Sequence, residues 1–423
     1  MAEWRIMKIL VIGSGGREHA IVRKLKESSK VTDIFCAPGN GGISADAKCV
    51  NITTNDEVVA FSKENNIDLV FVAPDDQLAQ GMVDAVENAG IKTFGPRQNA
   101  AIIEASKVFS KDLMKKYNIP TANYEVFDDS EKAIAYIKEQ NKVPVVVKAD
   151  GLALGKGVII AESIDEAVSA VNSIMQDKMF GESGNNIVIE EFITGPEVSV
   201  LSFTDGKVVK PMVSSKDHKR ALDGNKGLNT GGMGTISPNP HYTDEIAKEC
   251  METIFIPTMN AMNKEGRTFK GCLYFGLMLT QNGPKVIEYN ARFGDPETQV
   301  VLPRLETDLV DILLAVHEER LSEIDIKWSG EPCACVIMAS GGYPVAYEKG
   351  IEINGLDANG QLENATIYHA GTSFVNGKFL TNGGRVLGVT AKGENLSKAL
   401  ENAYKAVDKI SFKDAHYRTD IGK

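Results

Sequence analysis

Strand-forming and helix-forming segments alternate through the first hundred residues, and this alternation limits the chain to a small group of folds. Residues 6–12 are apolar and extended in character, residues 17–27 have the pattern of a helix, and residues 33–37 and 69–73 are again strand-like. Strands that alternate with helices form a parallel sheet with helices on both faces. We therefore predict an α/β fold with a doubly wound parallel sheet, which binds ligands at the carboxyl ends of its strands.

The length of the chain predicts more than one domain. Its 423 residues exceed the size at which a single hydrophobic core stops growing. We place boundaries near residues 105 and 330, which gives domains at 1–105, 106–330 and 331–423. The second domain begins with a helix that Ser106 caps and that ends before Pro120. Inside this domain lies a small unit at about 124–192, with helices near 131–140 and 164–178. Strands at 272–280 and 285–289 are predicted to form a hairpin around Asn282-Gly283 in the same domain. Short strands with glycine turns, closed by a helix at 396–409, make up the third.

The segment 285–299 combines more reactive groups than any other. A strand has a period of two residues, so Glu288 and Asn290 lie on the same face. Their oxygen donors suit a hard cation such as Mg²⁺. Arg292 adds a planar cation suited to a carboxylate or a phosphate. An edge strand that leads into a solvated turn would carry similar residues, so the chemical interpretation needs support from other segments.

A glycine-rich turn, Gly13-Ser-Gly-Gly-Arg-Glu-His19, joins the first strand to the first helix, where backbone N–H groups can bind a phosphate. It differs from the dinucleotide fingerprint, because Glu18 stands where a third glycine is required and strand two ends without an acid. We favour a phosphate-bearing substrate over NAD, with a plain tight turn as the third interpretation. The loops after strands two and three, at 38–42 and 74–76, fall on the same sheet edge.

A second glycine-rich loop, 148–157, places Lys148 and Lys156 where they can bind a polyphosphate, and its glycines allow the loop to open and close. Its spacing is not that of a P-loop, and an ordinary glycine loop is the alternative. A later strand, at 187–192, ends in Glu190-Glu191-Phe192, with Glu197 five residues beyond. This strand end could bind adenine and ribose, or it could simply be solvated.

A polar loop at 215–235 is too rich in charge and glycine for packing, and such loops inside compact domains are commonly functional. His218 within it could act as a base. Because Lys219 and Arg220 follow directly, contact with an anion is the better interpretation.

Charge and cysteine content exclude several classes of protein. The formal charge is −11 with no basic block, which argues against a nucleic-acid-binding protein. No apolar run reaches the roughly 18 residues needed to cross a membrane, and none of signal length precedes the first strand. The six cysteines are scattered without metal-site spacing. We therefore expect a cytoplasmic protein whose thiols are reduced.

With these segments assembled, the chain resembles the phosphoribosylamine–glycine ligase family, or glycinamide ribonucleotide synthetases, of the ATP-grasp superfamily. The motifs that carry the resemblance occur in order at 13–19, 37–40, 149–153, 217–220, 229–234, 292–299 and 381–387. The resemblance implies a pre-ATP-grasp domain, an ATP-grasp core with an inserted lid, and a mostly β C-terminal domain. It also implies ATP-dependent ligation of glycine to 5-phosphoribosylamine through glycyl phosphate, in purine biosynthesis.

The same resemblance assigns roles to individual residues. Arg292 and Lys148 would be catalytic, and Glu288 and Asn290 would hold Mg²⁺ or Mn²⁺. The implied ATP-binding residues are Lys107, Lys148, Gly151, Gly155, Lys156, Gly157, Glu190, Glu191, Phe192 and Glu197. The implied substrate-binding residues are Gly13, Gly15, Gly16, Arg17, Glu18, Gly39, Asn40, Asp75, Asp217, Lys219, Arg220, Arg292, Asp295, Pro296, Glu297 and Thr298. Asp75 lies where the family commonly has Gly-Pro-Glu, so this contact departs from the pattern.

The implied partners are small molecules: ATP as co-substrate, glycine and 5-phosphoribosylamine. We expect neither nucleic acid nor membrane as a partner, and we expect a monomer. Two alternatives stay open at this point. One is another ATP-grasp ligase or carboxylase of purine synthesis, and the other is a nucleotide-binding oxidoreductase that rests on the first domain alone.

Overall fold

A computed structural model describes residues 6–152 and 157–423. Its first part is a parallel five-stranded sheet in the order β3-β2-β1-β4-β5, which confirms the predicted doubly wound sheet. The strands are β1 (Met7–Gly13), β2 (Val31–Pro38), β3 (Lys48–Cys49), β4 (Leu69–Val72) and β5 (Lys92–Phe94). The flanking helices are α1 (Gly16–Lys26), α2 (Asn55–Glu64), α3 (Asp75–Ala79) and α4 (Met82–Asn88). Because β4 is buried along its whole length, its sequence is continuously apolar.

The order of the strands places the glycine-rich turn at a topological switch point. After β3 the chain crosses back over β2 and β1 to β4, so the loops that follow β1, β2 and β4 open at one sheet edge. Gly13, Gly39 and Asp75 stand at this edge, as the sequence predicted.

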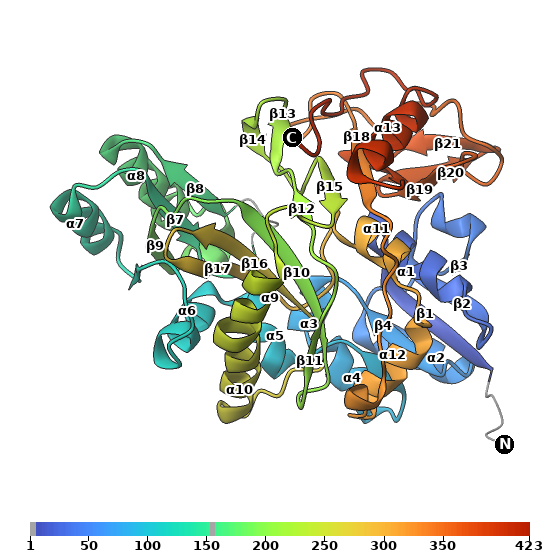
Figure 1. The fold of residues 1–423 in the computed structure, drawn as a ribbon, viewed down its shortest axis with the longest axis horizontal. Coiled ribbons are helices and arrows are strands. Elements are labelled where there is room, and N and C mark those ends of the chain that lie inside the picture. The colour runs from blue at the N-terminus through green and yellow to red at the C-terminus, as the bar shows by residue number, and fades with distance from the viewer. Residues whose placement is uncertain (1–5, 153–156) are drawn as a thin grey trace.

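Two four-stranded antiparallel sheets form the middle of the chain. The first, in the order β6-β9-β7-β8, carries α7 and α8 and lies at one end of the molecule in Figure 1. It comprises β6 (Tyr124–Phe127), β7 (Val145–Ala149), β8 (Val158–Ala161), β9 (Ile187–Glu191), α7 (Ser130–Gln140) and α8 (Ile164–Val171). We call it the lid sheet. α8 continues as a π-helical segment, Asn172–Gln176, in agreement with the helix predicted near 164–178.

The second antiparallel sheet, in the order β11-β10-β16-β17, is the core sheet. Its strands are β10 (Glu197–Thr204), β11 (Val209–Pro211), β16 (Gly271–Thr280) and β17 (Gly283–Asn290). Around it lie α5 (Gln98–Ala105), α9 (Asp244–Cys250), α10 (Ile256–Lys264) and α12 (Leu309–His317). α6 (Lys107–Lys116) contacts α5 and β9, and α11 (Thr298–Val301) contacts α1 and the strands of the C-terminal part. The predicted hairpin between β16 and β17 is present, with Thr280 opposite Gly283.

A β-bulge interrupts this hairpin at Ile287. Gly276 pairs with Glu288 but Leu277 pairs with Val286, so Ile287 is an extra residue in β17. The bulge lets Val286 and Tyr289 share one buried face although their spacing is odd. Glu288 and Asn290 are then left on the other face. The sequence predicted that Glu288 and Asn290 share a face, but it did not predict the bulge at Ile287 that changes the direction of their side chains.

The C-terminal part is mostly β, as expected, and is covered by α13 (Leu396–Val407) (Figure 1). Its five-stranded sheet has the order β12-β15-β18-β22-β19. Its strands are β12 (Lys216–Asp217), β15 (Gly234–Ser237), β18 (Cys333–Ala339), β19 (Thr366–His369) and β22 (Arg385–Lys392). Two hairpins complete it: β13 (Arg220–Leu222) with β14 (Lys226–Asn229), and β20 (Thr372–Val375) with β21 (Lys378–Thr381). Since β12 and β15 precede residue 330, this sheet joins segments from both sides of the predicted boundary, and the division into domains stays a prediction.

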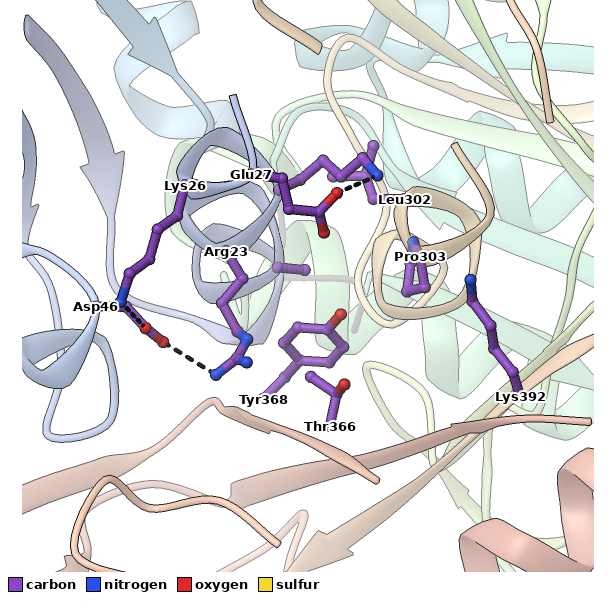
Figure 2. A pocket seen from close by; sticks show the side chains of 11 residues that line it. Arg23, Lys26, Glu27, Asp46, Leu302, Pro303, Thr366, Tyr368 and Lys392 are labelled. Carbon is purple, nitrogen blue, oxygen red and sulfur yellow. Dashed lines mark hydrogen bonds and ion pairs between the residues drawn. The ribbon is translucent and has the colours of Figure 1, made fainter. Parts of the chain in front are cut away.

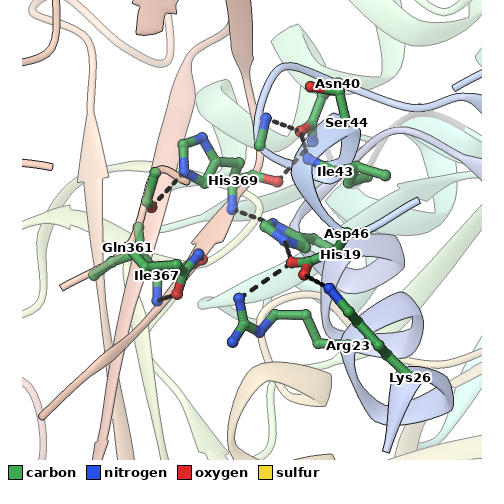
Figure 3. Close-up of polar contacts among 12 residues, drawn as sticks. His19, Arg23, Lys26, Asn40, Ile43, Ser44, Asp46, Gln361, Ile367 and His369 are labelled. Atoms are coloured by element: carbon green, nitrogen blue, oxygen red, sulfur yellow. Dashed lines mark hydrogen bonds and ion pairs between the residues drawn. The ribbon is translucent and has the colours of Figure 1, made fainter. Parts of the chain in front are cut away.

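The first and last parts of the chain meet along α1. A cavity lies there between α1, β19 and the end of β22 (Figure 2). Beside it, the backbone N–H of His369 donates to Nδ1 of His19 at 2.8 Å (Figure 3). Asn40 Nδ2 donates to the carbonyl of His369 at 2.7 Å, and its Oδ1 accepts from the N–H groups of Gly42 and Ile43. No helix among the described residues is long and apolar enough to cross a membrane.

Candidate active site

Glu190 joins two lysines between the lid sheet and the core sheet. Its carboxylate lies 2.8 Å from Nζ of Lys148 and 3.1 Å from Nζ of Lys111, and all three side chains are almost fully buried. Lys148 Nζ also donates to the carbonyl of Ile287 at 3.1 Å. This carbonyl belongs to the bulged residue of β17. The buried network therefore ties the end of β7 to the strand that carries Glu288.

The N-terminus of α6 holds the start of the glycine-rich loop. Ser106 caps α6 by accepting from the N–H of Phe109 at 3.0 Å, as predicted, and its hydroxyl donates to Asp150 at 3.1 Å. Lys107 Nζ donates to the carbonyl of Gly151 at 2.7 Å. Burial lowers the pKa of Lys107. Because a neutral carbonyl accepts from this ammonium, the positive charge of Lys107 stays available for an anion.

The other predicted ATP-binding residues that the structure describes lie beside β8, at the end of β9 and at the start of β10. Gly157 precedes β8, and its carbonyl accepts from the N–H of Ala149 at 2.8 Å. Glu191 at the end of β9 pairs with Lys285 at 3.2 Å, and Phe192 is 38% exposed. Glu197 begins β10 and lines a small pocket together with Glu288. Gly155 and Lys156 lie outside the described residues. The ATP-binding role of all these residues stays a prediction.

Glu288 and Asn290 present oxygen donors on one face of β17, as a hard divalent cation requires. Lys219 Nζ lies 3.2 Å from Oε1 of Glu288, and the charge of this ammonium lowers the pKa of Glu288 to about 2. Glu288 is therefore ionised at neutral pH. No group of three His, Cys, Asp or Glu side chains gathers at metal-binding distance in the described ranges. The donor set thus fits a cation that takes most of its ligands from phosphate oxygens and water.

Arg292 follows β17 directly and is held from behind by Glu104 of α5. Arg292 Nη2 lies 2.9 Å from Oε1 of Glu104, and Oε2 accepts from the N–H of Ala291 at 2.7 Å. Burial raises the pKa of Glu104 to about 7, and the charge of Arg292 opposes this shift. Nε of Arg292 is shielded from water and has no hydrogen-bond partner within residues 6–152 and 157–423. A buried donor without an acceptor is costly, so this N–H is suited to a ligand.

Phe293 fixes the loop after β17 in the core. Its ring lies 5.9 Å from the rings of Phe71 and of Phe203, which belong to the first sheet and to the core sheet. Arg17 of the glycine-rich turn donates to the carbonyl of Phe293 at 3.1 Å. The predicted phosphate turn is therefore in direct contact with the loop that follows the predicted metal strand, although 276 residues separate Arg17 from Phe293.

The residues that follow Phe293 contact three other parts of the chain. Asp295 pairs with Arg385 at 3.2 Å and accepts from Gln299 at 2.9 Å. Glu297 accepts from the hydroxyl of Ser199 at 3.2 Å, and Thr298 donates to the carbonyl of Gly294 at 2.5 Å. Pro296 packs against Gly232, where a Cβ would lie 2.4 Å from Cδ of Pro296. These contacts hold the loop, and a role in substrate binding stays a prediction.

The glycine-rich turn after β1 is tightly packed around Glu18. The N–H of Gly15 donates to Oε2 of Glu18 at 2.6 Å, and Oε1 accepts from Nε of Arg17 at 2.6 Å. Gly13 has a φ of +125°, and a Cβ there would lie 2.4 Å from Cγ of Glu18. At Gly16 a Cβ would lie 2.7 Å from Nε2 of Gln299. The glycines are thus required by close packing, whatever the turn binds.

Four further predicted residues are spread around this centre. Asp75 begins α3, and its charge adds to the burial that raises the pKa of Glu104. Asp217 is in β12, where burial raises its pKa and the charge of Glu297 adds to the shift. Lys219 contacts Glu288, as described above. Arg220 donates to the carbonyl of Gly227 in its own hairpin.

Sequence reasoning missed three residues of this site: Lys111, Glu104 and Arg385. Lys111 lies four positions after Lys107 and so shares a helix face with it, which is a usable signal. Arg385 lies inside the motif at 381–387 that was recognised without a role. Glu104 has no local signal, because its partners Ala291 and Arg292 are distant in sequence.

The fold and the site together define an ATP-grasp protein. A family model described as the phosphoribosylglycinamide synthetase ATP-grasp (A) domain matches residues 105–298. The N-domain and C-domain models of the same synthetase match residues 7–104 and 333–423.

Individual relatives agree with these matches. The phosphoribosylamine–glycine ligase of Caldanaerobacter subterraneus subsp. tengcongensis is 47% identical over 417 residues, which cover 98% of this chain and 99% of that protein. The ligase of Listeria monocytogenes serovar 1/2a is 48% identical over 420 residues, with 98% and 99% covered. A crystal structure of phosphoribosylamine–glycine ligase from Thermotoga maritima superposes with a TM-score of 0.85 at 32% identity and covers 98% of this chain and 99% of that one. The chain therefore belongs to the phosphoribosylamine–glycine ligase family.

Proposed function

We propose that this chain ligates glycine to 5-phosphoribosylamine, giving glycinamide ribonucleotide, with ATP converted to ADP and phosphate. Relatives that carry the name of this ligase match the chain over nearly its whole length, which supports the proposal. The structural observation that carries it is the contact of Arg17 with the carbonyl of Phe293. This contact places the glycine-rich turn, which is of a kind that binds phosphate, beside Phe293 and so next to Arg292. A ribose phosphate and an activated carboxylate can then meet at one place.

The first step of the proposed mechanism activates glycine. An oxygen of its carboxylate attacks the γ-phosphorus of ATP, the bond from the γ-phosphorus to the bridging oxygen breaks, and ADP leaves. This transfer needs positioning and charge neutralisation more than a nucleophilic side chain. Arg292 would hold the glycine carboxylate through its free Nε–H, and Lys107 and Lys148 would bind the phosphates. Glu288 and Asn290 would hold Mg²⁺ or Mn²⁺, which neutralises phosphate charge when bound.

The second step forms the amide. The amine of 5-phosphoribosylamine attacks the carbonyl carbon of glycyl phosphate, the carbon–oxygen bond to the phosphate breaks, and the nitrogen loses a proton. Gly13 to Glu18 with Gly39 and Asn40 would hold the ribose phosphate. Closure of the loop 151–157 would keep water from the acyl phosphate. Glu190 to Phe192 and Glu197 would bind the adenosine end of ATP.

We also propose that the protein works in the cytoplasm. Its six cysteines are all free, which agrees with a reducing compartment. The expected monomer stays a prediction.

The test of the proposed function is an ADP-release assay in which each substrate is omitted in turn. ADP release should require both glycine and 5-phosphoribosylamine, and mass spectrometry should detect glycinamide ribonucleotide. Glycine labelled with ¹⁸O in its carboxylate should transfer one labelled oxygen to the released phosphate, because that oxygen bridges to phosphorus in glycyl phosphate. ADP release at equal rates with and without glycine would exclude the ligase. Unlabelled phosphate would exclude the acyl phosphate route while leaving the overall reaction in place.

A further inference from the structure

A second cavity, which we call the α1–β19 cavity, shares no lining residue with the proposed active site. Its volume is about 360 Å³, within the range of small-molecule sites. It lies between the outer face of α1, the turn at residues 302–303, β19 and the end of β22 (Figure 2). The 11 lining residues are Ala20, Arg23, Lys24, Lys26, Glu27, Asp46, Leu302, Pro303, Thr366, Tyr368 and Lys392.

The lining carries an excess of positive charge in a protein whose net charge is −11. It contains four cationic side chains and two carboxylates. Both carboxylates are already paired: Glu27 lies 2.7 Å from Lys24, and Asp46 lies 2.7 Å from Lys26 and 3.1 Å from Arg23. For Lys392, the structure gives no ion pair within residues 6–152 and 157–423. An uncompensated excess of this kind favours an anionic ligand.

Tyr368 provides an independent observation. The residue is 5% exposed, and its hydroxyl makes no hydrogen bond within residues 6–152 and 157–423. Unlike the hydroxyl of Tyr242, it is not shielded from water. Figure 2 shows this hydroxyl directed into the cavity, between Arg23 and Lys392. Because the hydroxyl is open to the cavity, an acceptor on a ligand can take the place of water there. The hydroxyl is therefore placed to donate to an acceptor inside the cavity.

The apolar part of the lining indicates what else the ligand carries. Ala20, Leu302, Pro303 and the ring of Tyr368 form walls that a bare inorganic ion would leave uncovered. Arg23 uses Nη1 for Asp46, so its guanidinium has further N–H groups for a planar oxyanion.

We propose that the α1–β19 cavity binds a small organic phosphate monoester, at a site separate from the proposed active site. Arg23 and Lys392 contact the phosphate oxygens, the Tyr368 hydroxyl donates to one of them, and the apolar wall covers the organic part. The helix α1 connects the two places, because its N-terminal turn carries Arg17 and Glu18 while its following turns carry Ala20 and Arg23.

The experiment is an isothermal calorimetric titration of the full chain with ribose 5-phosphate. Wild-type protein should bind one more equivalent of ribose 5-phosphate than the double variant Lys392→Gln/Tyr368→Phe. Each single substitution should raise the dissociation constant of this additional equivalent at least about tenfold, because each removes a charged or hydroxyl donor. Added salt should weaken it further. Tyr368→Phe removes only the hydroxyl and Lys392 is exposed, so folding should be retained.

Two controls separate this site from the active site. Lys378→Gln changes an exposed lysine of β21 that pairs with Glu352, and it should bind as wild type does. Arg17→Gln alters the proposed substrate turn and should keep the cavity equivalent. The same stoichiometry and affinity in wild type and in the Lys392→Gln/Tyr368→Phe variant would overturn the proposal. Equal affinity for inorganic phosphate and ribose 5-phosphate would overturn the assignment to an organic ligand.

Discussion

At the scale of single residues, Arg292 shows how an incomplete hydrogen-bond set points to chemistry. Its Nη2 pairs with the carboxylate of Glu104, and its Nη1 donates to the carbonyl of Phe293 at 3.3 Å. Nε remains buried without an acceptor in the described structure. A guanidinium fixed on one side and unsatisfied on the other is positioned in advance for a ligand. This arrangement agrees with a clamp for the glycine carboxylate.

We predict that Arg292→Lys lowers kcat/KM for glycine by on the order of 100-fold, since lysine keeps the charge but loses the fixed Nε–H and the fork. Steady-state kinetics with varied glycine would measure the change. Arg97→Lys is the matched control, because Arg97 pairs with Glu87 on the surface and should be kinetically silent. Unchanged kcat and KM for glycine in Arg292→Lys would remove Arg292 from the mechanism.

At the scale of elements, helix ends and strand irregularities place the reactive groups. The N-terminus of α6 is closed by Ser106 and by Asp150, whose Oδ1 accepts from the N–H of Val108 at 3.2 Å and of Gly151 at 3.0 Å. One carboxylate therefore serves both the helix end and the start of the glycine-rich loop. The bulge at Ile287 plays a similar part in β17, since it turns a backbone carbonyl toward Lys148.

We predict that Ser106→Ala lowers the free energy of unfolding by about 1 kcal/mol, through loss of the cap, and also raises KM for ATP several-fold. The second effect follows because Asp150 loses a partner that fixes the loop at Gly151. Ser163→Ala removes the equivalent cap of α8, where Ser163 accepts from the N–H of Glu166 at 3.2 Å. It should lose similar stability without a change in KM. Denaturant unfolding and ATP kinetics on both variants would test this, and an identical KM in both would contradict the link.

At the scale of the whole molecule, segments far apart in sequence hold the three parts together. Arg17 contacts Phe293, Arg385 contacts Asp295, and His369 contacts His19. Nδ1 of His19 accepts a hydrogen bond from the N–H of His369, so the ring proton of His19 is on Nε2. This Nε2–H donates to Oδ2 of Asp46, and the two heavy atoms are 3.1 Å apart. Burial lowers the pKa of His19, and the nearby Asp46 opposes this shift. His19 is therefore neutral in the native protein.

We predict that this contact weakens in acid. A histidine whose native pKa is lowered binds a proton more readily when unfolded, so its contribution to stability is lost as the pH falls below about 6.5. At pH 5 the loss is at most about 2 kcal/mol for His19. Asn at position 19 cannot titrate, but its Oδ1 can still accept from His369. Between pH 7.5 and pH 5, the free energy of unfolding should therefore fall less steeply in His19→Asn than in the wild type. Equal slopes in the two proteins would contradict the prediction.

Much of this architecture was predictable because its signals are local. Alternating apolar strands and helices indicated the parallel sheet, Ser106 marked the start of α6, and the two-residue period placed Glu288 with Asn290. The motifs in their order indicated the family. Each of these signals depends on residues that are neighbours along the chain, so the sequence displays it directly.

The sequence by itself determined the fold class, the family and the residue types that can perform the chemistry. Only the tertiary structure decided which of them meet: Glu104 behind Arg292, Lys111 with Lys148 on Glu190, and Arg17 on Phe293. It also decided that β12 and β15 join the C-terminal sheet, and that Tyr368 and Lys392 face the same cavity as Arg23. The physical reason is that burial and charge pairing act between atoms that packing brings together. Such residues can be far apart in the sequence, and no local pattern then marks them as partners.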